Sequence, residues 1–195
     1  MSLPLVEIPP QIRNLLSFYK RKFKRKQYKH FRNLITGLIV SDNKTVQEIN
    51  DCFRDNDQSS MNRFLTKSEW NVQVINDARI EQIKGLCPLG NGILICDPTL
   101  LHKTGKHMEM ANYHYSGITK NKEWGHLLVN SFYTDNKGNS FPVCADVYIR
   151  EMNTNQEFPF KTTRDICLDQ LDYALRKLPI WLFMADAGLY ADYLI

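Results

Sequence analysis

The sequence predicts an α/β protein in which an amino-terminal helical domain, residues 1–85, precedes a mixed sheet in residues 92–195. Two observations predict this class. Apolar residues recur with a helical period up to residue 84, whereas after residue 92 they form short continuous or alternating runs that are typical of strands. Gly and Pro cluster between the two regions, as in a loop. We therefore expect the second region to run strand, strand, strand, helix, strand.

Length and composition exclude several other classes. A chain of 195 residues with 43% apolar and 24% charged residues can bury a core, which excludes a disordered or collagen-like protein. The longest apolar runs are far shorter than the ~18 residues of a membrane-spanning helix, and residues 1–4 do not resemble a signal peptide. Five cysteines, none in a Cys-x-x-Cys spacing, exclude a disulfide framework and a zinc ribbon. These features predict a cytoplasmic protein.

Four helices are expected in the first region, and they cover residues 31–39, 45–53, 59–66 and 72–84. Apolar residues spaced i, i+3, i+4, i+7 and i+8 from Phe31 predict the first helix. Thr45 and Glu48 have the spacing of a capping box, which opens the second. The two short helices joined by a polar turn resemble a helix-turn-helix, and the alternative is a plain helical bundle. In a helix-turn-helix, four residues would face DNA phosphates or base edges: Ser59, Ser60, Asn62 and Arg63.

Positive charge is concentrated near the amino terminus. Residues 1–40 carry nine Lys or Arg and one acid, Glu7, a balance of +8 in a chain whose net charge is +4. Eight of these cations lie in residues 20–32: Lys20, Arg21, Lys22, Lys24, Arg25, Lys26, Lys29 and Arg32. Such a density of like charge favours a polyanionic partner. Nucleic acid is the first interpretation, and a solvated helix face and an anionic membrane surface are the alternatives. Phe23, Tyr28 and Phe31 interleave with the cations and predict partial packing.

The second region is expected to hold four strands, residues 93–96, 126–134, 141–149 and 180–185, with a helix over 163–178 before the last strand. The first and last strands are continuous apolar runs, typical of strands buried on both faces. Asp135–Asn139 has the composition of a hairpin loop. Pro179 ends the helix.

The first and last strands each run into an aspartate, Asp97 and Asp186. A hairpin pair followed by a right-handed crossover makes these two strands parallel neighbours at the centre of the sheet. The aspartates then meet at the carboxyl edge, where α/β sheets bind ligands. Either one carboxyl is protonated or a hard cation lies between the two. Each aspartate alone is also an ordinary turn residue. We expect Mg²⁺, with Mn²⁺ as the alternative ion.

Several segments resemble the insertion-sequence DDE transposases, DNA strand-transfer enzymes with an RNase H-like core. Residues 97–106 (DPTLLHKTGK), followed by 112–117 (NYHYSG), resemble the first catalytic segment of that family. Residues 184–190 (MADAGLY) are similar to its second segment. Residues 45–53 and 58–70 resemble its amino-terminal helical domain. The resemblance covers most of the chain.

The resemblance implies an incomplete RNase H-like sheet in which Asp97 and Asp186 are the first two members of a metal-binding acidic triad. It implies magnesium-dependent cutting of DNA at element ends and strand transfer to target DNA. The enzyme would be nucleoid-associated, and the intact enzyme could be a homo-oligomer. The family often carries a second acid after the first Asp, where Pro98 stands here. Its third acid, usually Glu, has no counterpart before Ile195. We therefore expect the amino-terminal part of a transposase, truncated or frameshifted and inactive by itself.

Other residues near the first aspartate have two interpretations each. Lys103 and Lys106 either contact DNA phosphates or are ordinary loop lysines. Tyr113, Tyr115 and Trp124 either pack against the sheet or stack on bases.

Two other functions remain open. A non-catalytic DNA-binding fragment would use residues 20–32 and 45–66 and would compete with or regulate a full-length transposase. A phosphatase or nuclease unrelated to mobile elements would use the same acid pair. For the transposase and for the DNA-binding fragment, the expected partner is double-stranded DNA and not a membrane.

Overall fold

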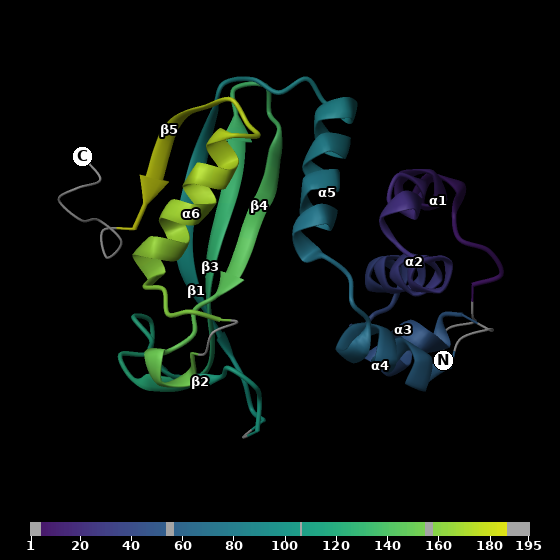
Figure 1. Cartoon of the computed structure of the whole chain (residues 1–195), viewed down its shortest axis with the longest axis horizontal. Coiled ribbons are helices and arrows are strands. Elements are labelled where there is room, and N and C mark those ends of the chain that lie inside the picture. The colour runs from purple at the N-terminus through teal and green to yellow at the C-terminus, as the bar shows by residue number, and fades with distance from the viewer. Residues whose placement is uncertain (1–4, 54–56, 106, 155–157, 187–195) are drawn as a thin grey trace. The chain divides into compact units, whose positions relative to one another are not determined.

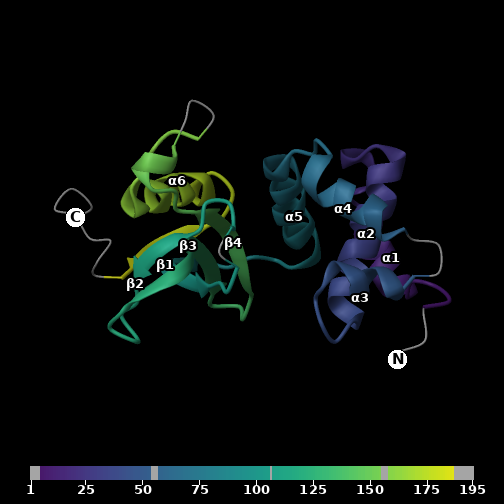
Figure 2. The ribbon, with the colours of Figure 1, turned by 90° about the horizontal axis from the view of Figure 1, so that it is seen from below.

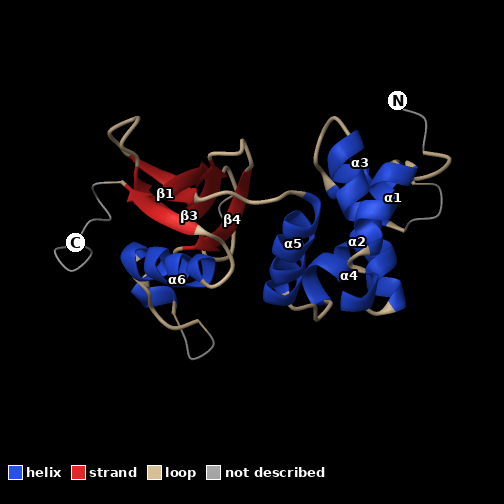
Figure 3. Cartoon of the chain, turned by 90° about the horizontal axis from the view of Figure 1, so that it is seen from above, coloured by secondary structure: helices blue, strands red, loops and turns tan. Residues whose placement is uncertain are grey.

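The computed structural model describes residues 5–53, 57–105, 107–154 and 158–186. The chain divides into two compact units, Met1–Ile83 and Lys84–Ile195. Helices make up the first unit and the second contains the sheet (Figures 1 and 3). The α/β class predicted from the sequence is confirmed. Among the described residues, no helix combines the length and the apolar character needed to cross a membrane.

The first part of the chain contains α1 (Pro10–Ser17), a 3₁₀ helix (Lys20–Lys22), α2 (Arg25–Val40), α3 (Val46–Asp51), α4 (Gln58–Lys67) and α5 (Val72–Leu86). The four predicted helices are present as α2 to α5. Helix α2 begins six residues before the predicted start, within the basic segment. Helix α1 was not predicted, because eight residues opened by Pro10 are too few for a clear helical period.

Aromatic and aliphatic side chains together form the core of the helical unit. Phe31, Ile49, Met61 and Phe64 are buried together. Thr45 caps α3 by accepting a hydrogen bond from the Glu48 amide at 3.2 Å. This core fixes the path of the basic segment, which contributes Phe31 to it.

The second part contains β1 (Gly92–His102), β2 (Asn112–Tyr115), β3 (Lys122–Asp135), β4 (Ser140–Val147), a 3₁₀ helix (Glu151–Asn153), α6 (Thr163–Leu175) and β5 (Ile180–Ala185). In the sheet, β3 pairs antiparallel with β1, β2 and β4, and β1 pairs parallel with β5. The strand order is β2-β3-β1-β5, with β4 also on β3. The first and last strands are therefore parallel neighbours, as predicted, but only β1 is central, because β5 lies at the end of the strand order.

Three details of the predicted sheet were wrong. The first strand does not end at Cys96 but continues to His102. A short strand, β2, was missed because its four residues NYHY show no apolar alternation. The edge strand β5 and the central strand β1 are not buried on both faces: Ile95, Leu182 and Met184 keep 37%, 38% and 47% of their surface exposed.

One face of the sheet is covered by α6 (Figure 2). Cys96 on β1 and Val129 on β3 pack there against Ile166 and Cys167 of the helix. Gln170, also on α6 and buried, donates to the Val129 carbonyl at 2.9 Å. The covered face thus fixes which residues of each strand point to the opposite face.

Candidate metal site and basic surface

Asp97 and Asp186 are brought together by the pairing of β1 with β5. The parallel register sets Cys96 opposite Ala185, and each aspartate is the next residue along its chain. Neighbouring strands lie about 4.8 Å apart. The two aspartates, 89 positions apart in the numbering, are therefore near neighbours at this rim of the sheet.

Asp97 lies on the sheet face opposite α6, and Asp186 lies one residue beyond β5. Cys96 and Ala185 pack into the cluster formed with Ile166 of α6. Because successive side chains of a strand point to opposite faces, Asp97 points away from that cluster, and Asp186 directly follows the end of β5. Both are exposed, so their oxygens are accessible to a ligand.

Asp97 lies in the middle of its strand and not at the carboxyl end. β5 ends at Ala185, opposite Cys96. Beyond that point β1 has no described neighbour on the β5 side. A strand edge of this kind tolerates the missing N–H of Pro98. The site therefore lies at the carboxyl end of β5, but it lies beside the middle of β1, which continues beyond it.

Asn130 is a residue of this rim that the sequence did not reveal. It is paired with Asp97 across β1 and β3 and is half-buried. Paired residues on neighbouring strands present their side chains on the same face. No local pattern marks Asn130, and only the register of a fourteen-residue strand places it beside the aspartate.

The side chains at this rim are of the type that binds a hard cation, but there are few of them. Carboxylate and amide oxygens are ligands that Mg²⁺ accepts. Among the residues that the structure describes, no three His, Cys, Asp or Glu side chains come together as a metal-binding group. Asp97 and Asp186 would therefore supply only part of a coordination shell, and the rest would come from water or substrate oxygens.

The basic segment, residues 20–32, is folded against the helical core. Phe23 and Phe31 are buried and stack with their ring centroids 4.6 Å apart. Tyr28 is half-buried against the same cluster, and Phe23 also lies 6.1 Å from the ring of Trp70. The predicted partial packing is confirmed, so the segment is not a loose tail.

The cations of this segment stay at the surface. Seven of the eight are exposed and Arg32 is half-buried. The first turn of α2 contains no acidic residue, so the positive end of the helix dipole adds to their charge. His30 adds little charge at neutral pH, because burial and then the neighbouring Lys29 lower its pKa. The result is a positive surface on an ordered backbone.

The amino-terminal end of α4 is organised around an acid. Asp57 caps the helix and accepts hydrogen bonds from the hydroxyls of Ser59 and Ser60 at 2.8 and 3.0 Å. Arg63 donates to the Ser60 hydroxyl at 3.2 Å and lies 3.9 Å from Asp57. Bonds from Ser59, then Ser60, lower the pKa of Asp57. Three of the four residues expected to face DNA are thus engaged by this carboxylate, and Asn62 is exposed.

Of the two lysines expected beside the acid pair, the structure describes only Lys103, and Lys103 is not brought to the pair. Lys103 follows β1, and its amide donates to the Trp124 carbonyl at 2.9 Å. Six residues of extended chain separate it from Asp97, which is roughly 20 Å. Lys106 lies outside the described residues.

Comparison of the sequence with models of known protein families and with curated proteins finds no match.

Proposed function

We propose that this chain takes part in metal-dependent cutting and transfer of DNA strands, in the manner of the DDE transposases that its sequence resembles. Asp97 and Asp186 would hold Mg²⁺, with Mn²⁺ as the alternative. The basic segment of residues 20–32 would bind double-stranded DNA. The strand pattern is compatible with an RNase H-like sheet, because two antiparallel pairings are followed by a helix and a parallel strand.

The observation that carries the proposal is the register of β1 with β5. It pairs Cys96 with Ala185, the residues that directly precede the two acids of the resembling segments, and this supports a shared site. Adjacent carboxylates repel each other, and a divalent cation between them relieves the repulsion. When bound, Mg²⁺ would polarise a DNA phosphate. The pair itself orients the ion, and Asn130 beside Asp97 can donate a hydrogen bond that fixes the carboxylate.

The basic surface supports the DNA part of the proposal. Its cations are exposed on an ordered backbone, so each can neutralise a phosphate and release a counterion. These contacts carry no sequence information. The surface would therefore position a duplex and not select its sequence.

A second candidate function is a non-catalytic DNA-binding protein that competes with a transposase for its sites. One observation favours it: among the described residues, no third His, Cys, Asp or Glu side chain joins the pair as a metal-binding group. In this case the basic surface would act alone, and Asp97 and Asp186 would have no role in the activity.

Iron-directed cleavage of bound DNA tests the proposal without requiring a complete active site. Fe²⁺ would replace Mg²⁺ at the pair, and ascorbate with peroxide would generate radicals that cut the nearest DNA. We expect cuts confined to a few positions of a short labelled duplex. Asp97→Asn and Asp186→Asn should each remove these cuts while leaving DNA binding intact.

Asp172→Asn is the matched control, because this exposed carboxylate of α6 pairs with Arg176 and has no place at the rim. It should leave the cuts unchanged. Uniform cutting that neither rim substitution alters would contradict the metal role and favour the second candidate. Failure to bind duplex DNA at all would contradict both.

A further inference from the structure

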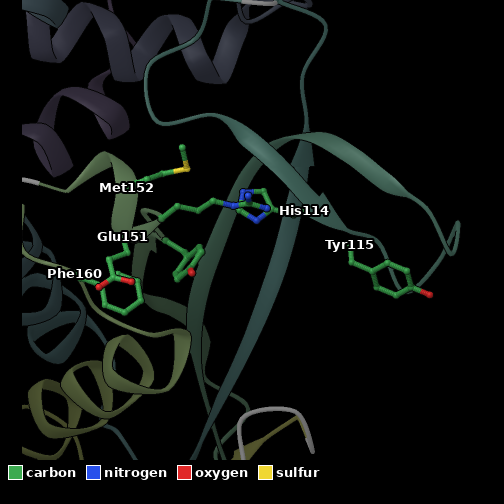
Figure 4. Close-up of a pocket in the computed structure, with 7 residues that line it drawn as sticks. His114, Tyr115, Glu151, Met152 and Phe160 are labelled. Atoms are coloured by element: carbon green, nitrogen blue, oxygen red, sulfur yellow. The ribbon is translucent and has the colours of Figure 1, made fainter.

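A pocket separate from the acid pair opens in the sheet unit (Figure 4). Its volume is about 510 Å³, which is within the usual range for small-molecule sites. It is lined by residues from β2, from the segment after β4 and from the segment before α6. The strand positions opposite Asp97 and His114 are Asn130 and Glu123. These positions are seven residue steps apart along β3, roughly 23 Å, so the pocket and the acid pair are independent.

Aromatic rings form the walls of this pocket. Tyr148 lies edge-on to His114, with centroids 6.0 Å apart, and edge-on to Phe160, with centroids 6.4 Å apart. In edge-on pairs, the face of one ring is not covered by the face of the other. Phe160 keeps 41% of its surface exposed, whereas the ring of Tyr115 points away from the other lining residues (Figure 4). The pocket thus offers aromatic surface to a flat ligand.

Two charged side chains, Arg150 and Glu151, line the same pocket. One Arg150 N–H donates to the Tyr113 carbonyl, which fixes the guanidinium, and a guanidinium carries five such donors. Glu151 is exposed and its carboxylate is an acceptor. A ligand that combines an anionic group with a hydrogen-bond donor therefore suits this lining.

His114 is the most buried residue of the lining. The residue is 7% exposed, and its Nε2 has no hydrogen-bond partner among the described residues. Burial, then Arg150 and His126, lower its pKa, so it adds no competing positive charge at neutral pH. A buried polar atom without a partner is costly. A polar ligand or a water molecule in the pocket could form the hydrogen bond that His114 Nε2 lacks.

We propose that this pocket binds one unpaired nucleotide. The base would stack on the aromatic walls, the phosphate would contact Arg150, and an exocyclic amine would donate to Glu151. Base stacking on aromatic side chains is tolerant of sequence and accounts for much of the affinity for single strands. The nucleotide has two sources, an unpaired position of a DNA strand or a free nucleoside monophosphate.

Fluorescence of 2-aminopurine, which changes when the base stacks, tests this proposal. The full chain carries alanine at Lys22, Lys24, Arg25 and Lys26, so that the basic surface does not dominate binding, and EDTA removes metal. The probes are a short single strand containing 2-aminopurine, the same strand annealed to its complement, and 2-aminopurine nucleoside monophosphate. Saturable binding of the single strand alone supports the strand as source. Binding of the monophosphate supports the free nucleotide.

Phe160→Ala should weaken binding of the preferred probe by about tenfold. The matched control is Phe158→Ala, which removes an equally exposed ring, at 41%, two residues away and outside the pocket lining. Glu151→Ala, at an exposed position, keeps the test valid if Phe160→Ala unfolds, and should weaken binding about threefold. The proposal would be overturned if the four-alanine protein bound the probe with the same affinity before and after the addition of Phe160→Ala or Glu151→Ala. Binding of the duplex as tightly as the single strand would also overturn it.

Discussion

At the scale of single residues, Asp135 organises the turn between β3 and β4. One carboxylate oxygen accepts hydrogen bonds from the amides of Lys137 and Asn139, both at 2.9 Å. The other accepts from the Gly90 amide at 2.7 Å and the Asn139 side chain at 2.9 Å. Burial raises the pKa of Asp135, but the bonds from the Asn139 side chain and from the three amides outweigh it and lower the pKa to about 2.

This shift predicts a dependence of stability on pH. The pKa of Asp135 in the folded chain, about 2, is below the unfolded value of about 3.9. Its stabilisation is therefore complete above about pH 4 and is lost as pH falls towards 2. Asp135→Asn should be less stable than wild type at neutral pH, and the difference should shrink in acid. Urea unfolding across this pH range measures it.

Asn136→Ala, in the same turn, is the control, because it leaves the carboxylate in place. It should retain the acid dependence of the wild type. A difference between wild type and Asp135→Asn that stays constant from neutral to acid pH would contradict this role of Asp135.

The acid pair shows which residues could be found from sequence. Asp97 and Asp186 each follow a continuous apolar run. This local pattern can be recognised in the sequence without knowledge of the sheet. Asn130 and His114 have no such signal. Their surroundings come from strand pairings that depend on the register of β3, which no short pattern specifies.

At the scale of elements, the contact between α2 and α3 depends on a glycine. A Cβ at Gly37 would lie 2.5 Å from Ile49 Cγ2 and 3.2 Å from the Ile49 Cα. Both residues are buried, and Ile49 belongs to the core of the helical unit. The helices can therefore cross this closely only because position 37 has no side chain.

Gly37→Ala should destabilise the helical unit. Crowding of a packed site typically costs about 1–3 kcal/mol, and the better helix propensity of Ala offsets only about 1 kcal/mol. Gly85→Ala in α5 is the matched control, since a Cβ there meets nothing within 4 Å, and it should be neutral or stabilising. Thermal unfolding of both variants tests this. Equal melting temperatures for the two variants would contradict the close crossing.

The lengths of the strands show where element prediction fails. Asp97-Pro98-Thr99 has the composition of a turn, yet it continues β1 because β3 pairs with the strand as far as His102. The long partner strand overrides the local turn preference. α6 and β5, by contrast, were predicted closely, because Pro179 separates a helical period from a continuous apolar run.

At the scale of the whole molecule, positive charge and the acid pair belong to different units. The basic segment lies in Met1–Ile83 and the pair in Lys84–Ile195. The sequence predicted the helix-to-sheet change because the hydrophobic period changes there. It did not predict that one face of the sheet stays partly exposed, because an apolar strand pattern is the same whether one layer or two cover the sheet.

The basic surface predicts a steep salt dependence of duplex binding. Replacing Lys22, Lys24, Arg25 and Lys26 with alanine should reduce the slope of log K against log salt by about 3 to 4, since each lost phosphate contact removes about 0.9. Fluorescence anisotropy of a labelled duplex at several salt concentrations measures the slope.

The charge-matched control replaces four exposed cations of the sheet unit with alanine: Lys122, Lys137, Arg164 and Arg176. It changes net charge equally and should leave the slope close to that of the wild type. Equal reductions in both variants would mean that net charge, and not the basic segment, governs binding.

Titration with Mn²⁺, followed by the electron spin resonance signal of the free ion, tests the central claim most directly. The account predicts that the full chain binds Mn²⁺ and that Asp97→Asn and Asp186→Asn each reduce this binding. The double variant should lose less binding free energy than the sum of the two single losses, because both side chains would serve one ion. If either substitution leaves Mn²⁺ binding unchanged, or if the wild type binds none, the two aspartates do not form a metal site.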